Sequence, residues 1–426
     1  MLQLRPDQNN ATTHIYENGE TYLVGQMGSG KTAVLLTAAR ELKRDGHISR
    51  VLIITTKAIA SNVYPIEVPK WCSELSMVTL TGTPKQRADM LALGTDIVVI
   101  NFEQIEWFFK NKISSSFDML IVDEVTKLAA GGLHFKKLRK HIPQFTTRVV
   151  ATGTPVSENW TKLFYPMMIV DNGAAFGRNK MAWLEKYFMT TDFQQRNWEV
   201  RLPDALTRLM AKNIFILNTY TDTLPALSKV FKRSRMTGPA GAAYVDMLKH
   251  MMTDGVEASN AAVKTGKLQQ LANGFLYETD SDLVRTYGSP KFYNFIPPSE
   301  PTVFVYQFRY ELDLLRGFMP DAVIVSEDAA AVQKFTRGDT NVILLHPRGA
   351  AHGIDLTRAS RMIMVSPIWS RDATQQVIAR IWRSGQKSTC TVETWVSDGT
   401  IEEEIVSREA GKASHHELLT RCLARL

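Results

Sequence analysis

The sequence predicts an α/β protein with two parallel sheets and a helical insertion between them. Two series of short runs rich in Val and Ile alternate with longer stretches of helical periodicity. Runs that are apolar throughout are typical of strands buried on both faces of a parallel sheet. The first series comprises residues 51–54, 96–100, 119–122 and 148–151, and the second comprises residues 303–306, 323–325, 342–345, 362–365 and 392–395. Because a long segment of different character separates the two series, we expect two sheets rather than one.

The segment between the two series predicts the helical insertion. From about residue 162 to residue 288 it has few β-branched runs and many Met, Leu, Trp, Lys and Arg residues. We therefore expect a first lobe at residues 1–165, the insertion at residues 166–287 and a second lobe at residues 288–426. The last stretch, residues 401–426, is expected to be helical.

Composition excludes several classes of protein. The chain has 426 residues, of which 44% are hydrophobic and 22% charged, as in ordinary globular proteins. No stretch reaches the roughly 18 apolar residues that a membrane span needs, and the first residues lack the apolar core of a signal peptide. The three cysteines lie far apart without metal-binding spacing, so neither a disulfide framework nor a structural zinc site is supported. We expect a cytoplasmic protein with no membrane partner.

The charge balance weakly favours a polyanionic partner. There are 50 Lys and Arg residues against 43 Asp and Glu, a formal net charge of +7. The excess is concentrated in residues 131–250, where 18 basic residues stand against 8 acidic ones. This window includes Lys232, Arg233 and Arg235, a charge run that is either a solvated face or a site that contacts nucleic-acid phosphates.

Residues 25–32, Gly-Gln-Met-Gly-Ser-Gly-Lys-Thr, fit the phosphate-binding pattern GxxxxGK[ST]. An apolar run precedes the pattern and a helical stretch follows it, which is the context that this loop requires. Its glycines let backbone N–H groups close around phosphates at a helix N-terminus. The predicted binding residues are Gly28, Ser29, Gly30, Lys31 and Thr32, with Lys31 reaching the β and γ phosphates and the Thr32 hydroxyl ligating Mg²⁺. The alternative is a glycine-rich turn before a helix.

Two carboxylates, Asp123 and Glu124, end the buried run at residues 119–122. We expect Asp123 to be a Mg²⁺ partner and Glu124 to be the base or orienter of an attacking water. The alternative is an ordinary solvated strand end.

The sequence Thr-Gly-Thr-Pro occurs twice, at residues 81–84 and 152–155. Only the second copy follows a β-rich strand after the acid pair. Thr152 and Thr154 are therefore predicted to form a movable hydrogen-bonded latch beside the γ-phosphate, whereas the first copy is expected to be a turn.

Arg380 and Arg383, three residues apart, are expected to share one face of a helix near the end of the chain. A pair of guanidinium groups on a second lobe suits a γ-phosphate whose charge spreads during transfer, which is the role of an arginine finger. The alternative is a solvated basic face.

Taken in order, these motifs resemble those of superfamily two helicase-fold ATPases, and most closely those of the Swi/Snf-type DNA translocases. Gln8, within Leu-Arg-Pro-Asp-Gln, is similar to the family's adenine-reading glutamine, and Gln376 to a residue that couples hydrolysis to movement. The matching segments are residues 4–8, 26–32, 123–126, 152–159, 303–308, 349–356 and 376–386, followed by residues 399–403. The resemblance covers both lobes, and the insertion only loosely.

The resemblance implies two RecA-like lobes that clamp ATP and Mg²⁺, close on binding, open after hydrolysis, and step along duplex DNA. The family's nucleic-acid contacts would fall on Thr56, Lys57, Asn101, His352 and Gly353. Hydroxyls, amides and helix N-termini meet backbone phosphates rather than bases, so binding independent of sequence is expected.

The chain also departs from the family. Motif II continues with Val125 and Thr126 where the family usually has Ala and His, so we expect altered coupling between hydrolysis and the Thr152 motif. The motifs begin and end close to the ends of the chain, so we expect no accessory domain. This compactness resembles the small members encoded by bacteriophages, and implies a monomer in the host cytoplasm. A strand-separating or branch-remodelling helicase, and a nucleotide-gated clamp that does not move, are the alternative functions.

Overall fold

In the computed structural model the chain forms two compact units. The first holds the described residues up to Leu217 and the second holds those from Leu224 onward. The described residues are 3–26, 28–153, 159–190, 197–217, 224–278, 283–293, 295–328, 330–350, 354–383 and 385–410. No helix in these ranges is long and apolar enough to cross a membrane.

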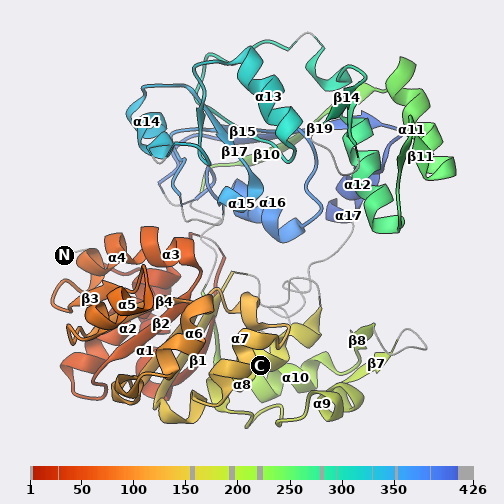
Figure 1. Cartoon of the computed structure of the whole chain (residues 1–426). Helices are drawn as coiled ribbons and strands as arrows, with labels where there is room; N and C mark the ends of the chain where they lie inside the picture. The colour runs from red at the N-terminus through yellow and green to blue at the C-terminus, as the bar shows by residue number, and fades with distance from the viewer. Residues whose placement is uncertain are drawn as a thin grey trace. The chain divides into compact units, whose positions relative to one another are not determined.

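The first unit is built on a seven-stranded parallel sheet with the order β3-β4-β2-β5-β6-β1-β9. Its strands are β1 (Glu20–Val24), β2 (Val51–Thr55), β3 (Met77–Thr79), β4 (Ile97–Asn101), β5 (Met119–Asp123), β6 (Thr147–Thr152) and β9 (Ile214–Ile216). The four runs predicted in this lobe are β2, β4, β5 and β6, so the predicted fold class is confirmed here (Figure 1).

Helices cover both faces of the first sheet because successive strand residues face opposite sides. Leu23 and Ile121 join an apolar cluster with the helices around the N-terminus, whereas Tyr22 and Val122 join a second cluster with later helices. The helices are α1 (Pro6–Asn18), α2 (Lys31–Arg44), α3 (Lys57–Asn62), α4 (Tyr64–Trp71), α5 (Pro84–Leu91), α6 (Ile105–Phe109), α7 (Leu133–Arg139), α8 (Phe164–Asp171), α9 (Lys180–Tyr187) and α10 (Pro203–Met210). A hairpin of β7 (Phe188–Thr190) and β8 (Trp198–Val200) follows α9.

The second unit contains a six-stranded parallel sheet with the order β10-β19-β18-β15-β17-β16. Its strands are β10 (Leu227–Arg235), β15 (Thr302–Val305), β16 (Val323–Ile324), β17 (Val342–Leu345), β18 (Arg361–Met364) and β19 (Cys390–Asp398). Its helices are α13 (Arg309–Phe318), α14 (Ala331–Arg337), α15 (Pro347–Ala350), α16 (Arg371–Ile378) and α17 (Ile401–Ala410). Figure 1 shows α13 on one face of the sheet, with α15 and α16 on the other. All five runs predicted in this lobe are strands of the sheet.

A small subdomain with its own apolar cluster belongs to the second unit. It consists of α11 (Gly238–His250), β11 (Met252–Thr253), β12 (Val256–Glu257), α12 (Ala261–Ala272), β13 (Phe275–Tyr277) and β14 (Val284–Thr286). Both pairs of short strands are antiparallel hairpins.

A buried polar network connects this subdomain to the second sheet. The fully buried Lys291 donates from Nζ to Glu402 Oε1 at 2.7 Å and to the Val365 carbonyl at 3.0 Å. Asn273 Nδ2 donates to Glu402 Oε1 at 3.1 Å, and Ser397 N donates to Glu402 Oε2 at 2.8 Å. Since Asn273 directly follows α12, Glu402 lies in α17 and Lys291 precedes β15, one carboxylate joins three parts of the unit.

The structure differs from the expected helical insertion at residues 166–287. The part up to β9 belongs to the first unit, and the part from β10 onward belongs to the second. The segment of β10 reads Leu-Ser-Lys-Val-Phe-Lys-Arg-Ser-Arg, and nearly all of its side chains are exposed. It pairs on one side with β19 and forms an edge of the sheet, where charged residues are common because they discourage further strand pairing. A strand that buries so little has no apolar alternation by which the sequence could predict it.

Candidate nucleotide-binding site

Three candidate motifs lie at the carboxyl ends of neighbouring strands, at the same edge of the first sheet. Val24 of β1 is paired in register with Thr152 of β6, and Asp123 of β5 is paired with Ala151. In open parallel sheets, ligands bind beyond the carboxyl ends of the strands. The phosphate loop after Val24, the acid pair and the Thr152 motif are therefore neighbours, although they are far apart in sequence. Thr154 lies outside the described residues.

The phosphate loop has the strand, loop and helix arrangement that its pattern requires. It runs from β1 into α2, and the Gly25 N–H donates to the Thr152 carbonyl at 3.1 Å. Gly28 and Gly30 have φ angles of 78° and 83°, a left-handed conformation that glycine adopts without strain. Met27 lies outside the described residues.

Lys31 and Thr32 open α2, so their side chains start at a helix N-terminus that favours anions. Lys31 Nζ donates to the carbonyls of Gly25 and Gln26 at 2.6 and 3.2 Å. The Ser29 hydroxyl is buried and has no hydrogen-bond partner among the described residues. A loop with glycine-only geometry, an ammonium group and an unpaired hydroxyl fits a nucleotide phosphate chain. The Thr32 hydroxyl and the Asp123 carboxylate are oxygen ligands of the kind that Mg²⁺ prefers.

Gln8 contacts the phosphate loop directly. This buried side chain in α1 donates from Nε2 to the Ser29 carbonyl at 2.9 Å and accepts the Arg5 N–H at 2.9 Å. Arg5 donates from its guanidinium to the same Ser29 carbonyl at 2.7 Å. The predicted adenine-reading residue thus lies against the backbone of the predicted phosphate-binding residues.

The acid pair ends β5 in two different environments. Asp123 is buried, and burial raises the pKa of its carboxyl, while the Lys31 ammonium and hydrogen bonds from Tyr64 and the Glu124 N–H act in the opposite direction. Glu124 is half-buried and has φ 58° and ψ 48°, a left-handed conformation that is uncommon for a residue with a Cβ. Backbone strain of this kind is concentrated at functional sites.

Tyr64 is a residue of this site that sequence reasoning missed. Its hydroxyl donates to Asp123 Oδ2 at 3.1 Å across 59 positions of sequence, and the residue is fully buried at the start of α4. Burial and the neighbouring Asp123 raise the pKa of Tyr64, so its hydroxyl stays protonated and donates. No local motif signals this contact, because the packing of α4 against the sheet creates it.

The first three candidate nucleic-acid residues lie at the ends of neighbouring strands. Asn101 ends β4 and is paired in register with Thr55, which directly precedes Thr56. Thr56 Oγ1 accepts the Ile59 N–H at 3.4 Å, and Asn101 Oδ1 accepts the Gln104 N–H at 3.1 Å, so both side chains cap helical turns. Lys57 is exposed in the first turn of α3. His352 and Gly353 lie outside the described residues.

The candidate arginines of the second unit do not share a helix face, and that prediction was wrong. Helix α16, which carries the half-buried Gln376, ends at Ile378, and both arginines follow it in turns. The turns form because the Arg380 carbonyl accepts the Leu356 N–H at 3.0 Å and Gln386 Nε2 donates to the Ile381 carbonyl at 3.0 Å. Arg380 is 6% exposed, so a solvated basic face does not describe it. Arg383 is half-buried.

The basic run Lys232, Arg233 and Arg235 lies on the edge strand β10 rather than in a helix. Arg233 forms ion pairs with Asp398 at 2.7 Å and Glu403 at 2.6 Å, so two carboxylates offset its charge. Lys232 Nζ lies 4.5 Å from the ring centre of Trp395, and Arg235 is exposed. The local positive field is therefore weaker than the residue count suggests.

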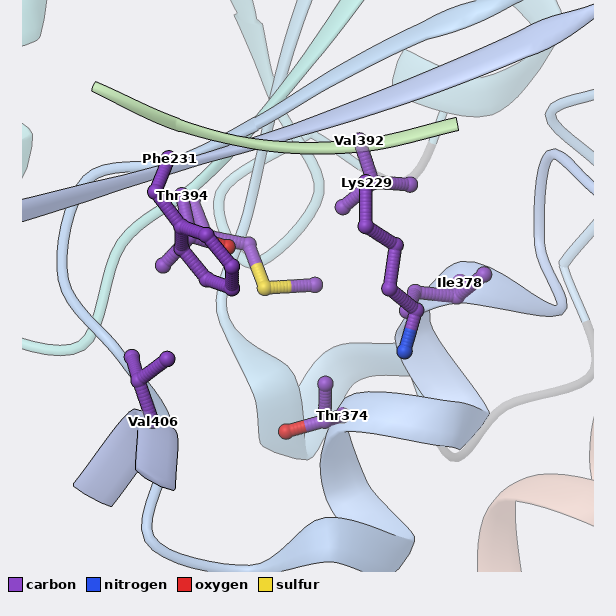
Figure 2. Close-up of a pocket in the computed structure, with 8 residues that line it drawn as sticks. Lys229, Phe231, Thr374, Ile378, Val392, Thr394 and Val406 are labelled. Atoms are coloured by element: carbon purple, nitrogen blue, oxygen red, sulfur yellow. The ribbon is translucent and has the colours of Figure 1, made fainter. Parts of the chain in front are cut away.

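A cavity of about 200 Å³ lies in the second unit between the sheet and two helices (Figure 2). Its lining is mostly apolar, with Lys229, Thr374 and Thr394 as polar members, and Figure 2 shows the Lys229 side chain extending toward Ile378. The lining residues come from β10, β18, β19, α16 and α17. Because this mostly apolar lining does not suit a phosphate chain, the candidate nucleotide site remains the one in the first unit.

Two family models match the chain. The model of the DEAD/DEAH box helicase domain matches residues 5–163, and the model of the helicase conserved C-terminal domain matches residues 322–385. The first match contains the phosphate loop and the acid pair, and the second contains Arg380 and Arg383.

Similar proteins include one from a virus and several concerned with DNA repair. A protein called p41 from Acyrthosiphon pisum secondary endosymbiont phage 1 is 23% identical over 99% of this chain and 98% of its own length. The Schizosaccharomyces pombe DNA repair protein rhp54 is 22% identical over 99% of this chain, and a Gallus gallus DNA repair and recombination protein of the RAD54-like type is 21% identical over 94%. The matches span 58% and 63% of these two relatives. Among solved structures, the Sulfolobus solfataricus SWI2/SNF2 ATPase core in complex with dsDNA has a TM-score of 0.48 and 17% identity, covering 96% of this chain and 91% of that chain.

Proposed function

Because the chain belongs to the Swi/Snf type of superfamily two helicase-fold ATPases and resembles a phage-encoded protein, we propose that it is an ATP-dependent translocase on duplex DNA. The observation that carries the proposal is the convergence of the phosphate loop, Asp123, Glu124 and Thr152 at one sheet edge. The names of two relatives, which concern DNA repair, favour DNA as the polymer.

In this proposal the first unit holds the substrate ATP. Lys31 and the N–H groups of the loop bind the β and γ phosphates, and Gln8 supports the loop from the adenine side. Thr32 and Asp123 would hold Mg²⁺, which supplies neutralisation of the charge on the phosphate oxygens. The Glu124 carboxylate orients the attacking water and accepts its proton.

In this proposal the second unit supplies positive charge for the transferred phosphoryl group. Arg380 and Arg383 stabilise the negative charge that spreads over the γ-phosphoryl oxygens, because guanidinium groups match phosphate geometry. Thr152, Thr154 and Gln376 couple the state of the nucleotide to movement.

DNA contacts in this proposal go to backbone phosphates. The exposed Lys57 begins α3, and Thr56 and Asn101 lie beside it on the carboxyl edge of the first sheet. Lys232, Arg233 and Arg235 on β10, together with His352 and Gly353, provide the contacts of the second unit. Such contacts make binding independent of sequence and sensitive to salt.

Steady-state ATP hydrolysis should be measured with no polymer and with duplex DNA, single-stranded DNA, forked DNA and RNA. We expect the strongest stimulation by duplex DNA, and displacement of a third strand from the duplex without separation of its two strands. Glu124→Gln should stop turnover and retain nucleotide, whereas the exposed control Glu103→Gln should behave as the unmodified protein.

Other results of these assays would reject the proposal or favour one of the alternative functions. Absence of stimulation by every polymer would reject the proposal. Separation of duplex strands would indicate a helicase, and nucleotide-dependent DNA binding with negligible turnover would indicate a clamp.

A further inference from the structure

We propose that Tyr64 is a positioning residue for the magnesium ligand Asp123, holding its carboxylate in the orientation that the metal requires. The inference rests on the proposed function, which assigns Asp123 to Mg²⁺. Tyr64 belongs to neither the phosphate loop motif nor the acid pair. It acts through Asp123 rather than on the substrate.

The first argument is the division of donors between the two carboxylate oxygens. Tyr64 donates to Asp123 Oδ2 at 3.1 Å, and the Glu124 N–H donates to Asp123 Oδ1 at 3.1 Å. The carboxylate torsion of an aspartate is soft, so one donor would leave its plane free to turn. Two donors on different oxygens fix the plane. A carboxylate has about four lone-pair positions, so acceptor positions remain for a metal or its water.

The second argument is the rigidity of the tyrosine itself. Its ring is fully buried in the apolar cluster that also contains Ile121 of β5 and Leu35 and Ala38 of α2. A ring in a close-packed core has little freedom, so the hydroxyl is held at a fixed position. Because α2 begins with Lys31 and Thr32, the same cluster fixes the metal carboxylate and the helix that carries the other proposed ligand.

Tyr22 provides a matched control within the same sheet. It is also fully buried, but its hydroxyl has no hydrogen-bond partner among the described residues, and its ring lies in the other apolar cluster. Tyr22→Phe therefore removes the same hydroxyl group from a core tyrosine without touching Asp123.

The test is the affinity of Mn²⁺ for the complex with ADP, measured by electron paramagnetic resonance on the full chain. Tyr64→Phe should weaken Mn²⁺ binding by about tenfold, since loss of a partner that orients a metal ligand typically costs 10- to 100-fold in affinity. ADP affinity in the presence of EDTA should stay unchanged, and Tyr22→Phe should match the unmodified protein in both measurements. The Mg²⁺ concentration for half-maximal hydrolysis should rise in parallel, with near-normal turnover at saturating Mg²⁺.

Three results would overturn the role of Tyr64: unchanged Mn²⁺ affinity in Tyr64→Phe, an equal loss in Tyr22→Phe, or a loss of ADP affinity without metal. Tyr64→Met is a second variant with the same expectation, because its flexible side chain fills the site without a donor. If the unmodified protein itself binds no Mn²⁺ with ADP, the assignment of Asp123 fails and the role of Tyr64 fails with it. Hydrolysis by the unmodified protein with unchanged Mn²⁺ affinity in Tyr64→Phe rejects this inference alone.

Discussion

Gly30 lies where the N-terminal helix α1 packs against the phosphate loop. A Cβ built on Gly30 would lie 2.1 Å from Gln8 Nε2, and the backbone there has φ +83°. The conformation therefore favours glycine, and a Cβ would force the Gln8 amide to move away.

Gly30→Ala should destabilise the protein and also weaken ATP binding. The left-handed conformation costs an alanine about 1–2 kcal/mol, and the clash displaces Gln8 from the loop. Gly46→Ala is the control, because Gly46 has φ +77° and a Cβ added there would meet no other atom. This variant should therefore lose only the free energy that the left-handed conformation costs an alanine. Thermal unfolding and ATP titration of both variants check this, and equal ATP affinity in the two would contradict it.

At the residue scale, what the sequence could predict depends on whether a site is contiguous. The phosphate loop and the acid pair are short patterns whose strand context can be recognised, and the structure has that context. Tyr64 joins the site only through packing, and the turns that hold Arg380 and Arg383 depend on hydrogen bonds to residues 356 and 386. No local pattern encodes such distant partners.

At the element scale, the basic residues of the edge strand β10 differ in whether carboxylates already hold their charge. Lys232→Gln and Arg235→Gln should each lower the slope of log affinity for duplex DNA against log salt concentration by about 0.9, as expected for one phosphate contact. Arg233→Gln should change it less, because Asp398 and Glu403 already hold that guanidinium. Affinity titrations at several salt concentrations test this, and three variants with unchanged slopes would make β10 a solvated edge.

The network around Glu402 predicts a large effect from one buried lysine. Lys291→Met leaves a buried carboxylate without its counter-charge, which should cost about 3–5 kcal/mol of stability in the second unit. The control is Arg316→Met, since the exposed Arg316–Glu327 ion pair in the same unit should contribute less than about 1 kcal/mol.

Amide hydrogen exchange in β15 and β18 measures these losses, because it reports the second unit separately from the first. Equal losses in Lys291→Met and Arg316→Met would contradict the prediction. The double variant Lys291→Met with Glu402→Gln should recover part of the loss, because it also removes the unpaired charge.

At the scale of the whole molecule, hydrolysis is proposed to need residues of both units. Arg383→Ala should leave ATP binding largely intact and stop hydrolysis, since the first unit alone holds the ground state. Arg337→Ala, at an exposed position of α14, is the control and should hydrolyse ATP normally. Equal activity of the two variants in a DNA-stimulated ATPase assay would reject the role of Arg383.

The two-sheet architecture could be predicted because parallel strands are buried on both faces and therefore read as continuous apolar runs. All nine predicted runs are strands of the two sheets. The extent of each unit could not be predicted in the same way. β9 reads Ile-Phe-Ile, a short apolar run inside the stretch that was expected to be helical, and β10 is mostly exposed and has no apolar run.

The position of β9 has a mechanical consequence. The Leu217 N–H donates to the Val24 carbonyl at 2.8 Å, and a Cβ on Gly25 would meet the Leu217 side chain at 3.0 Å. Within seven positions of Leu217 the polypeptide has entered the second unit. A pull on the backbone at Leu217 would therefore act directly on the first glycine of the candidate phosphate loop.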